Sequence, residues 1–186
     1  IITKQKIIVM ADRINSKKKG SRNERQLSKI FEKWTNLTFS RTPSSGGLRW
    51  HRTDDTVGDI ICTSKGFIDT FPFSIETKFH RDINFQELLT GNKGCKIMEF
   101  WNQALEDSKR GCKIPLVLMR YNNLPKGMYF VLIPVGVFTK LKVFIPNKYG
   151  RLNYNKIFYI INSIDLFNSD YSKVFSKILR NGKIKN

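Results

Sequence analysis

The residue types with the clearest chemical potential lie in residues 71–80, where Glu76 and Lys78 stand two positions apart. Polar and apolar residues alternate along this segment, which predicts a β-strand with one face in the core. Because side chains two positions apart leave a strand on the same side, the carboxylate and the amine should lie next to each other. Burying such a pair is unfavourable unless both groups have partners or a chemical task. An acid-x-Lys pair alone is common, and the alternative is an ordinary surface pair on an exposed strand.

A second carboxylate, Asp59, lies in the preceding apolar segment 58–62, which also predicts a strand. If the two strands pair, Asp59 and Glu76 converge at one end of the sheet. Two carboxylates in a notch are typical of a Mg²⁺ or Mn²⁺ site, where waters and a substrate phosphate complete the coordination. Such a metal activates water and stabilises charge on a phosphate, while Lys78 orients or deprotonates the attacking water. The predicted chemistry is therefore hydrolysis of a phosphodiester.

The charge balance indicates a polyanionic partner. The chain carries 33 Lys plus Arg against 15 Asp plus Glu, which gives a formal net charge of +18. Self-repulsion of this size destabilises a folded chain, and a DNA duplex, which releases counterions when its phosphates are neutralised, is the natural partner. An AT-rich genome explains many Lys and Asn residues but not the small number of acids. No segment resembles a basic amphipathic helix with a lipid-facing stripe, so a membrane partner is not expected.

Helical and strand patterns alternate along the chain, which predicts an α/β fold with a mixed central β-sheet flanked by α-helices. We expect a basic, mobile N-terminal arm over residues 1–20, then one domain over residues 21–186 that ends in a C-terminal extension. The expected helices are 21–34, 97–110 and 169–180; the expected strands are 58–62, 71–80, 114–120, 128–133 and 158–164; residues 135–145 are expected to be strand or turn, and residues 81–95 irregular.

Composition excludes several other classes. The chain has three widely spaced cysteines and two histidines, a spacing that does not predict a structural zinc site. The cysteines suggest reduced thiols inside a cell. The longest apolar run, residues 128–138, is too short to span a bilayer, and no signal peptide is visible. The expected location is therefore the cytoplasm of a host cell or its nucleoid, and not the outside of a cell.

Four segments together resemble the Holliday junction resolvases of archaea and phages, which belong to the PD-(D/E)XK nuclease superfamily. They are Gly20-Ser21-Arg22-Asn23-Glu24-Arg25, Arg41-Thr42-Pro43-Ser44-Ser45-Gly46-Gly47, Gly58-Asp59-Ile60 and Ile75-Glu76-Thr77-Lys78. Residues 100–103 and 114–117 are similar to a later helix and strand of phage members. Gly58 stands where the superfamily motif has Pro, and residues 121–186 add little to the likeness. The resemblance implies a restriction-endonuclease-like core.

The resemblance also implies catalytic roles. Asp59 and Glu76 would bind the metal, with the Thr77 carbonyl as a further ligand, and Lys78 would be the catalytic lysine. Glu24 would complete the metal shell from the early helix. Its alternative role is the capping-box partner of Ser21 at the start of that helix.

The remaining site residues are expected to act near the DNA backbone. The resemblance places Ser44 and the catalytic candidate Ser45 near the scissile phosphate, Arg41 on the backbone, and Gln103 within reach of the active site. Basic and aromatic clusters add further DNA-binding candidates, namely Lys17, Lys18, Lys19, Arg49, Arg52 and His80. For Lys17–Lys19, Arg49, Arg52 and His80, the alternative is solvated surface charge.

These features predict a Mg²⁺-dependent (or Mn²⁺-dependent) endodeoxyribonuclease that cleaves branched DNA such as four-way junctions. A resolvase cuts two strands symmetrically, so a homodimer would follow. The alternatives are a sequence-specific restriction-like or homing endonuclease, a non-catalytic basic DNA-binding module, and an RNA-directed nuclease.

Overall fold

The structure is a computed structural model that describes residues 2–42, 57–91 and 94–179, with side chains over 18–42, 57–91 and 94–178. The strands are β1 Phe39–Arg41, β2 Ile60–Cys62, β3 Phe73–His80, β4 Ile114–Tyr121, β5 Phe130–Pro134, β6 Leu152–Tyr154 and β7 Phe158–Asn162. The helices are α1 Ile2–Thr35, α2 Gln86–Leu89, α3 Lys96–Arg110, α4 Val135–Leu141, α5 Ser163–Phe167 and α6 Tyr171–Leu179.

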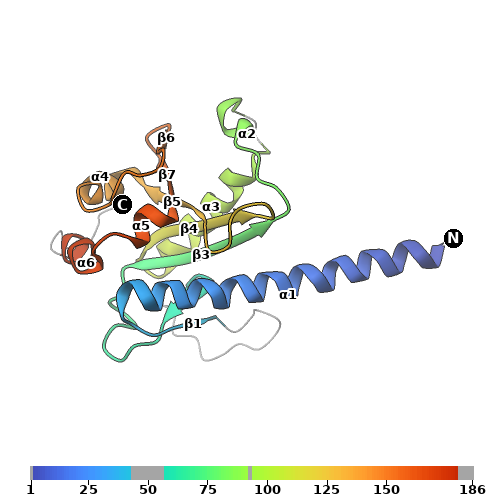
Figure 1. The fold of residues 1–186 in the computed structure, drawn as a ribbon, viewed down its shortest axis with the longest axis horizontal. Coiled ribbons are helices and arrows are strands. Elements are labelled where there is room, and N and C mark those ends of the chain that lie inside the picture. Colours follow the sequence, from blue (N-terminus) through green and yellow to red (C-terminus); the bar gives the residue numbers. More distant parts are fainter. Residues whose placement is uncertain (1, 43–56, 92–93, 180–186) are drawn as a thin grey trace.

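The seven strands form one mixed sheet in the order β1-β2-β3-β4-β5-β7-β6 (Figure 1). Strands β3 and β4 are parallel, with Glu76 opposite Val117, and every other neighbouring pair is antiparallel. The chain crosses from β3 to β4 through α3, as a parallel pair requires. The long strands β3 and β4 therefore stand at the centre of the sheet.

Helices cover both faces of the sheet, which confirms the predicted fold class. Leu27 and Phe31 of α1 pack with Ile75 of β3 in one core, to which α4, α5 and α6 also contribute. Phe100 and Trp101 of α3 belong to a second core on the opposite face. Because both faces are covered, β4 is apolar along almost its whole length and buried from Ile114 to Arg120.

The alternation predicted for residues 71–80 is confirmed in β3. Ile75 lies in the core on the α1 side, and the Thr77 side chain bonds to α1. Glu76 and Lys78 both contact Gln103 of α3 on the other side. The polar side of β3 is therefore covered by a helix, and Glu76 is only 3% exposed.

Three predictions about secondary structure were wrong. Helix α1 begins at Ile2 and not at Ser21, so residues 2–20 are helical and Ser21 is no N-cap. Residues 2–19 contain neither Gly nor Pro, so nothing in them ends a helix.

Residues 135–141 form helix α4, in which Val137, Phe138 and Leu141 bury one face at helical spacing. Residues 81–95 include the short helix α2, and β6 went unpredicted.

Candidate active site

A close contact between two backbones brings β2 to β3. Gly58 has φ +90°, and a Cβ there would lie 2.6 Å from the Ile75 carbonyl oxygen, so a side chain at this position would collide with β3. The Asp59 N–H donates to that same Ile75 oxygen at 2.8 Å. Position 58 therefore needs glycine here, which gives a physical reason for the departure from the Pro of the superfamily motif.

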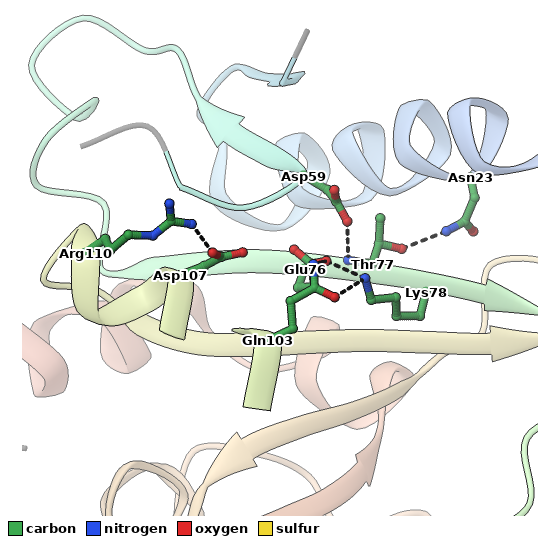
Figure 2. A network of polar contacts seen from close by, with 8 residues as sticks. All are labelled: Asn23, Asp59, Glu76, Thr77, Lys78, Gln103, Asp107 and Arg110. Carbon is green, nitrogen blue, oxygen red and sulfur yellow. Dashed lines mark hydrogen bonds and ion pairs between the residues drawn. The ribbon is translucent and has the colours of Figure 1, made fainter. Parts of the chain in front are cut away.

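Asp59 is held against β3 through its side chain as well. Its Oδ2 accepts a hydrogen bond from the Thr77 N–H at 2.9 Å (Figure 2). The N–H and the C=O of one strand residue point to the same strand edge, so the Thr77 carbonyl should also face the Asp59 side. The Asp59 carboxylate and the backbone of Thr77 thus share one edge of β3, next to Glu76.

Glu76, Lys78 and Gln103 form a closed triangle of hydrogen bonds (Figure 2). The Lys78 ammonium lies 2.6 Å from Glu76 Oε1 and donates to Gln103 Oε1 at 3.0 Å. Gln103 Nε2 donates to Glu76 Oε1 at 3.1 Å. The amide of α3 therefore holds the carboxylate and the amine of β3 together, and both are largely buried.

Burial disfavours the ionised form of both carboxylates in this arrangement. Desolvation and the charge of Asp59 raise the pKa of Glu76 to about 7, although Lys78 opposes the shift. Desolvation also raises the pKa of Asp59, against the Thr77 hydrogen bond and the Lys78 charge. Two partly desolvated carboxylates that destabilise each other's charge are stabilised by a shared cation. The donor set therefore fits a hard divalent metal ion.

Glu24 approaches this centre but is paired elsewhere. Its Oε2 lies 2.7 Å from Nε of Arg41, while its charge contributes to raising the pKa of Asp59. Within residues 18–42, 57–91 and 94–178, no three His, Cys, Asp or Glu side chains lie close enough together to hold a metal ion. The described centre thus offers two carboxylates, Asp59 and Glu76, and the role of Glu24 as a metal ligand stays a prediction.

Comparison with protein families decides the class. The model described as "Phage putative PDDEXK endonuclease" matches residues 15–178, which is most of the chain. The chain belongs to this family. It is thus an endonuclease of the PD-(D/E)XK superfamily, as the four motif segments predicted.

Two further comparisons accompany this result. No curated protein matches the sequence of this endonuclease. Among solved structures it is similar to Hjc of Archaeoglobus fulgidus, a Holliday junction resolvase from an archaeal hyperthermophile, with 15% sequence identity and a TM-score of 0.38. That match covers 85% of this chain and 99% of the archaeal one.

The endonuclease has two polar residues near the centre that were not among the predicted site residues. Asp107 lies one turn beyond Gln103 on α3, and its charge raises the pKa of both Asp59 and Glu76. The i, i+4 spacing of Gln103 and Asp107 was a signal in the sequence, since both fall on one helix face. Asp107 is also ion-paired with Arg110 (Figure 2).

Asn23 is the second of these residues. It is buried on α1, where its Nδ2 donates to Thr77 Oγ1 at 2.7 Å and its Oδ1 accepts from the Tyr129 hydroxyl at 3.0 Å. The amide thus ties α1 to the residue that lies between Glu76 and Lys78. Asn23 adjoins Glu24 in the motif, but its burial could not be deduced without the packing of α1 on β3.

The predicted DNA contacts fall into separate places. Arg41 pairs with Glu24, and His80 packs on Phe100 with ring centroids 4.8 Å apart. Burial and nearby lysines lower the pKa of His80. Lys18 and Lys19 line a cavity on the α1 side of β3. Four of the predicted residues lie outside the described ranges, namely Ser44, Ser45, Arg49 and Arg52. A fifth, Lys17, lies in a part of α1 where no side chain is described.

None of the helices in the described ranges is both long enough and apolar enough to cross a membrane.

Proposed function

We propose that this endonuclease hydrolyses DNA phosphodiesters with a divalent cation, Mg²⁺ or Mn²⁺, and that its preferred substrate is branched DNA such as a four-way junction. The observation that carries the proposal is the buried Glu76 carboxylate, which is flanked by Lys78 on its own strand and by Asp59 in the loop before β2. A structural ion pair alone would not need a second carboxylate whose charge opposes the first.

Asp59, Glu76 and the Thr77 carbonyl would hold the cation. Glu24 would join them if its carboxylate turned away from Arg41. The bound cation would supply Lewis-acid stabilisation of the phosphate charge and a lowered pKa for water. Since Asp59 is fixed by the Thr77 N–H, its free oxygen is the one available as a ligand.

Lys78 is the residue proposed to act on the nucleophile. Its ammonium is held by Glu76 and Gln103, so it lies beside the proposed metal ligands and not in bulk solvent. In this position it can orient the attacking water and share the negative charge that develops on the phosphate. We assign Gln103 a positioning role, because its amide accepts a hydrogen bond from Lys78 and donates one to Glu76.

The substrate proposal is supported by charge and by motif resemblance. A net charge of +18 suits the phosphate density of DNA, and residues 20–78 resemble junction resolvases. Two symmetric cuts at a junction require two active sites, so we propose that the active form is a homodimer.

The decisive experiment compares substrates under identical conditions. Labelled linear duplex, flap and four-way DNA are incubated with the protein in Mg²⁺, in Mn²⁺ and in EDTA, beside the Glu76→Ala variant. The proposal expects metal-dependent cuts in the four-way substrate, weaker cleavage of linear duplex and no cleavage by the variant. Cleavage of linear duplex at one sequence, with junctions ignored, would replace the junction proposal by a restriction-like activity. Binding without cleavage in any metal would contradict catalysis.

A further inference from the structure

A cavity of about 370 Å³ opens on the α1 side of the sheet, near the C-terminal ends of β3 and β4. Five cationic side chains and one aromatic ring line it, namely Lys18, Lys19, Arg22, Arg120, Lys126 and Phe79. No acidic residue is among the described side chains that line it. Within the described part of the chain, none of the five cations forms an ion pair with a carboxylate.

Arg120 is the buried member of this cluster. It is 7% exposed and lies 4.8 Å from the Phe79 ring centre. Its Nη2 donates to the Leu124 carbonyl at 2.9 Å, but its Nε has no hydrogen-bond partner among the residues that the structure describes. A buried guanidinium with an unsatisfied N–H and no counter-charge is unfavourable, and an anion in the cavity would supply the missing counter-charge.

Lys19 approaches the same ring. Its Nζ lies 3.9 Å from the Phe79 centroid and donates to the Asn122 side chain. Burial and the charge of Arg120 lower the pKa of Lys19, so the two cations destabilise one another. A single aromatic ring thus holds two like charges together, an arrangement that a shared anion stabilises.

The cavity is connected to the catalytic strand. Phe79 follows Lys78 directly in β3, and Asn23, which also lines the cavity, donates to Thr77 Oγ1. Phe79 lies three positions after Glu76, about 10 Å along β3, and its side chain is on the α1 face of the sheet, whereas that of Glu76 is on the α3 face. A phosphate in the cavity would therefore belong to a part of the DNA molecule that passes the C-terminal ends of β3 and β4 to reach the α1 face, while another phosphate of the same molecule lies at Glu76.

We infer that this cavity binds a non-scissile phosphodiester of the DNA substrate, with Arg120 and Lys19 as its inner donors and Arg22 and Lys126 at its rim. This inference rests on the proposed function, because DNA is taken as the ligand. Guanidinium and ammonium groups both bind phosphate oxygens, and the guanidinium can do so through two N–H donors. Occupation of the cavity would fix the position of the DNA relative to β3 and so select which phosphodiester lies at Lys78.

The test measures DNA binding in EDTA, so that it does not depend on cleavage. The double variant Lys19→Gln/Arg22→Gln is compared with Lys29→Gln/Arg25→Gln, which removes the same charge from exposed positions of α1 that do not line the cavity. We expect the first pair to weaken binding about tenfold, and to reduce the salt dependence by about one unit of log–log slope per lost contact. The second pair should change both quantities much less. Equal losses in the two pairs would overturn the inference and indicate general attraction.

A methylphosphonate scan tests the position. Neutralising one phosphate at a time in a four-way substrate should reveal one flanking position that weakens wild-type binding but not binding of Lys19→Gln/Arg22→Gln. A matched substrate with and without a 5′-phosphate distinguishes an internal diester from a terminal monoester, and dependence on the 5′-phosphate alone would overturn the diester assignment. The variant Arg120→Gln serves as a further arm if its thermal unfolding matches that of the wild type.

The outcomes separate this inference from the proposed function. A protein that never cuts DNA but shows the position-specific loss retains the cavity assignment and contradicts catalysis. A protein that cuts DNA but shows no such position retains catalysis and contradicts the cavity assignment.

Discussion

The Thr77 N–H donates to the Asp59 carboxylate at 2.9 Å, so a side chain of the loop before β2 takes the place of a backbone partner on β3. This hydrogen bond fixes one carboxylate of the centre on the strand that carries the other. It depends on the close approach of Gly58 to Ile75, because that approach carries Asp59 to the strand edge.

Gly58→Ala should therefore disturb the site severely. A Cβ at φ +90° would lie 2.6 Å from the Ile75 oxygen, which no backbone tolerates without a shift. We expect a loss of about 2 kcal/mol or more in the free energy of unfolding, measured by urea denaturation, and loss of cleavage. Gly66→Ala is the matched control, since Gly66 has φ +82° but a Cβ there would have no atom of the described residues within 4 Å. Equal losses of stability and cleavage in Gly58→Ala and Gly66→Ala would show that the positive φ accounts for the effect and that the contact with Ile75 does not.

Glu76→Gln should abolish cleavage and yet stabilise the metal-free protein at about pH 8. The folded pKa of Glu76 lies near 7, above its usual 4.5, so this group favours the fold below about pH 4.5 and that contribution is lost as pH rises through 7. Removing the charge should raise the free energy of unfolding by on the order of 2 kcal/mol at about pH 8, and much less at about pH 5. Thermal unfolding in EDTA measures this difference. The exposed Glu99→Gln is the control on α3, and a pH-independent effect of Glu76→Gln would contradict the prediction.

The affinity for the metal should also depend on the ionisation of Glu76, but it should rise with pH, whereas the stability of the metal-free protein falls. A cation binds the ionised carboxylates, so protons compete with it below the pKa of Glu76. We expect the Mg²⁺ affinity, measured by calorimetry, to rise by up to about tenfold per pH unit below pH 7 and to level off above it. An affinity that does not change between about pH 5.5 and 8 would exclude Glu76 as a ligand.

Lys78→Met should lower the cleavage rate by about 10²–10⁴-fold while DNA binding persists, because the amine is proposed to act on the attacking water. Gln103→Ala should lower the rate less, and it should alter the pH profile of cleavage, since it removes a hydrogen bond from both Lys78 and Glu76. Single-turnover kinetics with excess enzyme measures both. Asn102→Ala, exposed next to Gln103 on α3, is the control. An unchanged rate for Lys78→Met would remove this residue from the mechanism.

Asn23→Ala should destabilise the protein by about 1–3 kcal/mol, because it leaves Thr77 Oγ1 and the Tyr129 hydroxyl without this partner in a buried region. Tyr129→Phe removes only one of the two hydrogen bonds and should have a smaller effect. Urea unfolding of the two single variants and the double variant gives the coupling between them. Strict additivity would mean that the two side chains do not act as a network.

Local patterns in the sequence predicted the elements that lie at the centre of this fold. Alternation along β3 is a property of neighbouring residues, so the placement of Glu76 and Lys78 on one side of a strand needed no knowledge of the rest of the chain. The helical spacing in α3 and the apolar runs in β4 and β5 predicted these elements for the same reason. The prediction failed where short-range preference was ambiguous, as in residues 135–141, which form a helix because Val137, Phe138 and Leu141 find a core to enter.

The arrangement of the site depends instead on contacts between distant parts of the chain. Asp59 meets Thr77 across 18 positions, Gln103 meets Lys78 across 25, and Asn23 meets Thr77 across 54. Arg120 lies buried beside Phe79 because β3 and β4 pair in parallel, with Phe79 opposite Arg120. Strand order and helix placement follow from the burial of apolar surface over the whole molecule, and no local spacing encodes them. The chemical groups were therefore visible along the chain, whereas their distances, their desolvation and the basic cavity arose from folding.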